Sequence, residues 1–213
     1  RATSDLQSYY LSGSYYSEKT SVQLIHFGGG EETYQAWWGV PEGKLKGDAD
    51  LLATHMINNG YDSQDSANLV NSDPRSYNYY TYENEVDNYK QTHYQLHVDH
   101  KFSSALNLNL TVFRIEGEGY FEQYKDQEEL ADYGIEPELV GDSLFTISDL
   151  IRRRWLDNHF YGFTYAVNYT GKKVNATLGG GWNQYMGKHF GEAIESDFTE
   201  YEELSQRYYD NDA

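Results

Sequence analysis

The chain has 213 residues, with 16 basic and 34 acidic side chains, a formal net charge of −18 and no cysteine. This acidic balance repels nucleic-acid phosphates, so we expect no DNA or RNA partner, and the lack of cysteine excludes disulfides, thiolate nucleophiles and Cys-ligated metals. The 22 Tyr and 4 Trp beside only 3 Pro argue against disorder and favour β-structure with aromatic rings at an interface.

The first predicted element is a β-hairpin over about residues 6–27. Aromatic and apolar residues alternate with serines on its first arm, and a polar turn at 17–20 separates the two arms. Alternation with a period of two is typical of a strand with one apolar and one polar face, and a short turn between two such runs predicts antiparallel pairing. Residues 28–87 are then expected to form a long outer loop.

The second predicted hairpin, about residues 89–124, has the clearest alternation. Leucine and valine take every second position from Leu106 to Val112, with Asn and Thr between them. The following segment, residues 125–151, contains eight acidic residues and one basic residue. We expect this segment to be a loop in water, because water solvates such a density of charge.

The third predicted hairpin covers about residues 155–187. An apolar face of about nine residues runs from Tyr161 to Tyr169, opposite Gly, Thr, Ala and Asn. Residues 189–213 are expected to form a third long loop, and eight acidic residues follow Gly191.

Two architectures contain strands with one apolar and one polar face. In a soluble β-sandwich the apolar face packs on a second sheet, whereas in an outer-membrane barrel it contacts lipid and the other face lines a wet lumen. Short turns alternate here with long loops, which is the outer-membrane pattern, and loops above about 15 residues are uncommon in compact domains. The sequence contains no run of about 18 apolar residues, so we expect no transmembrane helix.

Three segments at the proposed strand–loop junctions resemble one family. Residues 32–41 (ETYQAWWGVP) resemble a TYQAWNGVP segment, residues 85–97 (EVDNYKQTHYQLH) an ETDNYQQDHYQLH segment, and residues 117–125 (GEGYFEQYK) a GxGYYEQYK segment. All three occur in TonB-dependent outer-membrane receptors of the Bacteroides group, in this order. Trp38 departs from the pattern, which has Asn there.

The resemblance implies an all-β, antiparallel, up-and-down transmembrane barrel of 22 strands around a plugged lumen, of which this chain would supply about six. It implies import of a scarce solute (a siderophore, vitamin, haem or glycan) across the outer membrane of a Gram-negative bacterium. The partners would be membrane lipid, the solute and the TonB complex, which acts through a plug domain. The family's plug, TonB box and terminal aromatic strand have no counterpart in these residues, so we expect an internal section.

The first loop contains the candidate ligand-binding residues Tyr34, Trp37 and Trp38. Aromatic side chains at an extracellular mouth could stack on a solute. The alternatives are packing within the loop and a place in the aromatic girdle at the lipid interface.

Arg152, Arg153 and Arg154 precede Trp155 at the expected outer end of a strand. Arginines there could bind lipopolysaccharide phosphates through bidentate hydrogen bonds. Pairing with the acidic segment just upstream is the alternative, and the sequence favours neither.

Other polar clusters give weaker signals. His93, His97 and Asp99 share one strand face and could hold a metal or haem, but lumen-facing polar residues are the simpler interpretation. The acidic runs 200–203 and 210–212 lack calcium-site spacing and read as solvated loops. We expect no cofactor, metal or enzyme activity, because no motif resembles a catalytic constellation. The competing hypothesis is a secreted soluble β-sandwich that binds glycans through exposed Tyr and Trp.

Overall fold

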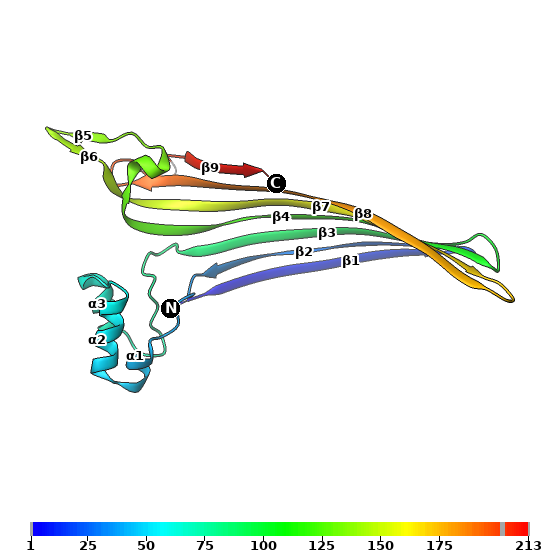
Figure 1. Ribbon diagram of the computed structural model, residues 1–213, viewed down its shortest axis with the longest axis horizontal. Coiled ribbons are helices and arrows are strands. Elements are labelled where there is room, and N and C mark those ends of the chain that lie inside the picture. The colour runs from blue at the N-terminus through cyan, green and yellow to red at the C-terminus, as the bar shows by residue number, and fades with distance from the viewer. Residues whose placement is uncertain (1, 201–202, 213) are drawn as a thin grey trace.

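The computed structural model describes residues 2–200 and 203–212, and most of them form one long antiparallel sheet (Figure 1). Its strand order is β1-β2-β3-β4-β7-β8-β9, so each strand pairs with the strand before and after it in this up-and-down series. The strands are β1 (Ser4–Tyr16), β2 (Thr20–Tyr34), β3 (Val86–Lys101), β4 (Leu106–Glu129), β7 (Ile147–Thr170), β8 (Asn175–Ser196) and β9 (Gln206–Asp212).

The remaining elements lie at the end of the sheet opposite the short turns (Figure 1). Three helices connect β2 to β3, and a short helix η1 with a small hairpin connects β4 to β7. These elements are α1 (Glu42–Lys46), α2 (Ala49–Asn58), α3 (Ser63–Asn71), η1 (Leu130–Tyr133), β5 (Glu138–Val140) and β6 (Ser143–Phe145). In the part of the chain that is described, no helix has the length and apolar character needed to cross a membrane.

The all-β prediction and the antiparallel hairpins are confirmed, but the predicted boundaries are not. The sheet has seven strands rather than six, and β4 and β7 each continue for 24 residues. The expected loops are therefore shorter than 28–87, 125–151 and 189–213, and the first of them is partly helical. The strands extend because backbone pairing continues beyond Val112, where charged residues replace the apolar ones on one side of β4 and Phe113 and Ile115 lie on the other.

The strand register brings the alternating apolar residues together on one side of the sheet, which we call the apolar face. One row of paired residues across six strands consists of Gly13, Leu24, Leu96, Val112, Phe163 and Trp182. The next row consists of Ser14, Gln23, His97, Thr111, Thr164 and Gly181. Successive residues of a strand point to opposite sides, so this second row belongs to the polar face.

The apolar face is exposed. Leu11, Leu24 and Leu178 have 62%, 57% and 69% of their surface accessible, and no second sheet covers them in the described residues. The cluster of buried residues lies instead at the loop end of the sheet. It consists of Leu130, Tyr133, Leu150 and Ala193, with Ile135, Leu204 and Tyr208 packed against it.

The apolar face covers only the half of the sheet next to the short turns. Toward the loop end, the same side of β4 carries Arg114, Glu116 and Glu118, which alternate with residues of the polar face. Asp157 pairs with Glu118 on the neighbouring strand β7. A band of apolar side chains is thus bordered by charged side chains further along the same strands. These strands are longer than the 9–11 residues that a strand needs to cross a bilayer.

Tyrosine rings lie over glycines at several places in the sheet. A Cβ atom at Gly117 would overlap the Tyr89 ring, and one at Gly187 would overlap the Tyr185 ring. Glycine leaves room for a neighbouring ring to lie flat on the sheet, and the ring covers backbone that glycine leaves bare.

Candidate functional site

Residues 35–85 leave the sheet at the end of β2, form three helices and return at β3; we call them the helical loop. Asp48 caps α2 by accepting hydrogen bonds from the backbone N–H groups of Asp50 and Leu51. Lys44 Nζ donates to the carbonyl oxygen of Leu69, and both side chains are buried. The helical loop is therefore a folded insertion with its own small core.

Trp37 and Trp38 lie at the start of the helical loop and are 55% and 62% exposed. The Trp37 ring packs edge-on against Tyr80 and Phe121, with ring centroids 6.1 and 5.7 Å apart. Phe121 is ten residues along β4 from Thr111, an even number, so its side chain belongs to the polar face. Trp37 consequently stands on the polar side of the sheet, at its loop end.

Tyr34 is separate from this exposed pair. Its hydroxyl donates to the carbonyl oxygens of Tyr82 and Tyr80 at 2.5 and 3.3 Å. Burial and the nearby Glu85 carboxylate raise the pKa of Tyr34, so the hydroxyl keeps the proton that these bonds need. Of the three predicted ligand-binding residues, two are available to a ligand and Tyr34 anchors the returning chain.

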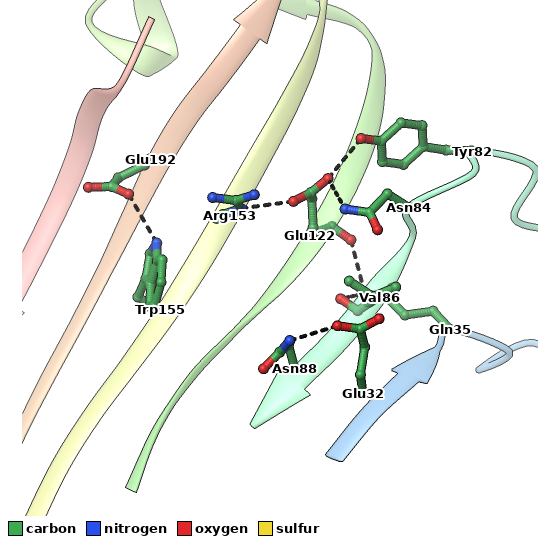
Figure 2. Close-up of polar contacts among 10 residues, drawn as sticks. All are labelled: Glu32, Gln35, Tyr82, Asn84, Val86, Asn88, Glu122, Arg153, Trp155 and Glu192. Atoms are coloured by element: carbon green, nitrogen blue, oxygen red, sulfur yellow. Dashed lines mark hydrogen bonds and ion pairs between the residues drawn. The ribbon is translucent and has the colours of Figure 1, made fainter. Parts of the chain in front are cut away.

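A buried carboxylate holds the helical loop to the sheet (Figure 2). Glu122 of β4 is fully buried and accepts hydrogen bonds from Tyr82 Oη, Asn84 Nδ2 and Arg153 Nε at 2.7, 2.7 and 2.8 Å. Gln35 Nε2 donates to the carbonyl oxygens of Val86 and Glu122, both at 3.1 Å. We call Gln35, Tyr82, Asn84, Glu122 and Arg153 the clamp.

A second carboxyl group, Glu85, is buried beside the clamp. Its residue is 3% exposed, and its Oε2 accepts a hydrogen bond from the Tyr124 backbone N–H at 3.2 Å. Burial raises the pKa of Glu85 to about 7, and the neighbouring Glu122 charge acts in the same direction. The Tyr124 bond and the cations of Lys125 and Arg152 oppose that rise.

The three arginines do not form one patch. Because side chains alternate along β7, Arg153 points to the side of the apolar face, whereas Arg152 and Arg154 point to the polar side. Arg153 is bound by Glu122 and lies over the Tyr120 ring, 4.6 Å from its centroid.

The other two arginines also have partners within the chain. Arg152 donates to Gln123 Oε1 and Tyr133 Oη, each at 3.0 Å. Arg154 donates to Tyr209 Oη at 3.2 Å. Among the described residues, Arg153 pairs with Glu122, which lies on β4 and outside the acidic segment 125–151. Lipopolysaccharide contact stays a prediction, and the geometry adds nothing in its favour.

The histidines of β3 have polar partners of their own. His93 bonds Gln91 and stacks on Phe27, and His97 bonds Thr111 at 3.0 Å. Among the described residues, no three His, Asp or Glu side chains are placed to hold a metal ion.

In the described part of the acidic runs near the C-terminal end, no group of side chains is placed to hold a metal ion. Asp210 accepts a hydrogen bond from Arg207 Nη1 at 2.8 Å. Residues 201–202, in the middle of the other run, and the side chain of Asp212 lie outside the described part of the structure.

Sequence reasoning found the exposed tryptophans and missed the clamp. Glu85 and Glu122 lie inside the segments 85–97 and 117–125, where each acid stands among aromatic residues. That aromatic context is the signal that could have marked them as buried. It does not show that Glu122 meets Tyr82 and Asn84, which lie 40 and 38 residues before it in the chain.

No family model and no curated protein matches this chain. The resemblance to TonB-dependent receptors therefore depends on the three sequence segments described above.

Proposed function

We propose that the chain forms part of the wall and outer loops of an outer-membrane β-barrel, and that this barrel is a TonB-dependent importer. The observation that carries the proposal is the exposed apolar face, which is continuous over six strands. Removing one Leu, Val or Phe side chain from water is worth about 1.5–3 kcal/mol. A face of this size needs a nonaqueous neighbour, and lipid is one that fits a single sheet.

The position of the charged residues supports one orientation of the sheet relative to the membrane. The short turns would lie on the periplasmic side, and the charged half of the sheet would stand outside the lipid with the helical loop and the β5–β6 hairpin. Tyr94, Tyr161 and Trp182 lie on the apolar face near its border with the charged residues, where membrane proteins place aromatic girdles. The two edge strands, β1 and β9, would pair with further strands of the barrel wall.

The polar face would line the lumen, and Trp37 and Trp38 would stand at its outer mouth. Exposed indole rings bind small molecules and sugars by stacking, so we assign these two residues to the capture of the imported solute. Release into the periplasm would depend on a plug domain and the TonB complex, as the family resemblance implies. The proposal gives no residue a role in covalent chemistry and needs no cofactor.

The soluble β-sandwich needs a partner layer for the apolar face. Leu96, Val112 and Phe163 would have to interdigitate with a second sheet, and the described residues supply none. The exposed tryptophans fit either function, so the sandwich hypothesis depends on a layer that would have to come from elsewhere.

A matched pair of substitutions tests the proposal. Phe163 and Thr164 are adjacent and exposed, and their side chains point to opposite faces. Phe163→Arg should reduce the detergent-extracted, heat-modifiable form, because an arginine on the lipid-facing side of the wall is destabilising. Thr164→Arg should leave that form at the level of the parent protein. A protein that is freely soluble without detergent and tolerates both changes would contradict the proposal.

A further inference from the structure

Gln35 and Glu85 face each other where the helical loop joins the sheet. The Gln35 backbone N–H donates to the Glu85 carbonyl oxygen at 2.7 Å, which extends the β2–β3 pairing by one rung beyond Tyr34 and Val86. Side chains directly opposite each other on paired strands have Cβ atoms about 5 Å apart. The two residues are 1% and 3% exposed, so bulk solvent does not reach them.

The hydrogen bonds of the Gln35 side chain satisfy only one end of its amide group. Both hydrogen bonds of the Gln35 side chain use its Nε2 as donor, whereas its Oε1 is buried and has no donor among the described residues. Buried polar atoms nearly always have a partner, because an unpaired one loses its bonds to water without replacement. A protonated Glu85 can supply the donor, since its Oε2 already accepts from Tyr124 and its other oxygen can carry the proton.

We propose that Glu85 holds a proton when the helical loop is closed and donates it to Gln35 Oε1, so that the loop is fastened by a proton-dependent latch. When Glu85 ionises, Gln35 loses its donor and a second negative charge stands beside Glu122. The helical loop is then released from the sheet, together with Trp37 and Trp38.

The charged groups around Glu85 make it the carboxyl group that keeps the proton. Glu122 accepts hydrogen bonds from Tyr82, Asn84 and the Arg153 guanidinium, so cationic and polar donors already surround that carboxylate. Lys125 and Arg152 attract a charge on Glu85, but Lys125 pairs with Glu128 at 2.9 Å and Arg152 bonds neutral groups. The remaining titratable neighbours, Tyr34 and Tyr80, carry hydroxyls whose pKa the Glu85 charge raises.

The direction of the pH effect follows from the two states. The closed loop has a Glu85 pKa of about 7, and the released side chain would return to its ordinary value of 4.5. Closure therefore takes up a proton between these values. The ratio of closed to open loop should fall roughly tenfold for each pH unit between about 5 and 7, and should be constant above that range.

Spin labels can measure this opening, because the chain has no natural cysteine to interfere. Cysteines at Ile57 on α2, which is 78% exposed, and at Glu118 on β4 would carry the labels in the full chain in detergent. We expect a single narrow distance distribution at pH 5 and a broader one at pH 8. Glu85→Gln should stay narrow at both values, because its amide keeps an acceptor for Tyr124 and gives Gln35 a permanent donor. Glu83→Gln, an exposed neighbour on the same segment, should behave like the parent.

The same distribution at pH 5 and pH 8 in the parent, or the same pH response in Glu85→Gln as in the parent, would overturn the latch. Infrared spectra give a second measure that does not depend on opening. The parent at pH 6 should show a protonated carboxyl C=O band that Glu85→Gln lacks, and no difference between the two would also overturn the latch. The latch involves contacts within the chain, so these outcomes are independent of whether the wall lies in a membrane.

Discussion

Arg153 Nε lies 2.8 Å from Glu122 Oε2, and this ion pair joins three parts of the molecule. The side chains are 15% and 0% exposed, so solvent screens the pair weakly. Glu122 also holds Tyr82 and Asn84 of the helical loop, which connects strands β4 and β7 to the segment that carries the exposed tryptophans. The position of the helical loop thus depends on a charge pair inside the sheet.

Arg153→Leu should lower the free energy of unfolding by about 3–5 kcal/mol, because it leaves the Glu122 charge buried without its cation. Adding Glu122→Gln should restore part of the loss. Arg207→Leu is the control, since the side chain of Arg207 is 50% exposed in its pair with Glu192 and should contribute about 1 kcal/mol or less. The gel-shift unfolding temperature in detergent gives the comparison, and equal losses for both arginines would contradict the role of burial.

The four tryptophans should differ in their accessibility to quenchers. Trp37 and Trp38 are 55% and 62% exposed at the loop end and should be quenched by aqueous iodide. Trp182 is 49% exposed on the apolar face and should be quenched by brominated lipid. Trp155 donates to Glu192 at 3.0 Å (Figure 2) and should respond least to either quencher. Variants that each keep a single tryptophan would allow the quenching of each residue to be measured separately. Iodide quenching of Trp182 in liposomes would contradict the assignment of the faces.

Glu85 should give stability a measurable pH dependence. Its pKa is raised to about 7 in the folded protein, so its contribution is complete below about pH 4.5 and is lost as the pH rises through 7. The difference in unfolding free energy between the parent and Glu85→Gln should change by about 3 kcal/mol over that range. Taking the difference removes the opposing effect of Glu128, whose pKa Lys125 and Tyr133 lower. A difference that is constant with pH would exclude a protonated Glu85.

Gly117→Ala should destabilise the sheet by about 1–3 kcal/mol, because the new Cβ would overlap the Tyr89 ring and force it to move. Tyr89→Ala combined with Gly117→Ala should cost less than the sum of the single changes. Gly13→Ala is the matched control, since no atom lies within 4 Å of the Cβ position there. If both glycine substitutions have the same effect on the unfolding temperature, tyrosine packing over glycine is not what selects Gly117.

The sequence predicts the half of the sheet next to the turns well. Along residues 106–112 and 161–169, one face carries apolar residues at every second position, and this period of two can be read directly. The continuation of β4 toward Glu129 is harder to read, because the apolar residues change sides after Val112. Phe113, Ile115 and Phe121 lie on the side of the polar face, and Arg114, Glu116 and Glu118 lie on the other side. Periodicity therefore reports the band of apolar contacts rather than the full strand.

Signals for the helices in the first loop were present but small. Asp48 and Asp62 are N-caps of α2 and α3, and residues that favour helices follow each of them. Neither helix has a clear apolar stripe, and α2 has no fully buried residue, so the period of 3.6 is weak. The clamp could not be predicted at all, because it depends on Gln35 and Glu122 meeting from distant positions in the chain.

The measurement that tests the central claim most directly is a cysteine scan of residues 107–112 on β4 in liposomes. Each position would carry a single fluorophore, and brominated lipid would be the quencher. We predict strong quenching at Leu108, Leu110 and Val112 and weak quenching at Asn107, Asn109 and Thr111, because only the first set lies on the apolar face. Quenching that is absent or equal at all six positions would show that this face does not contact lipid, and would contradict the assignment to a membrane barrel.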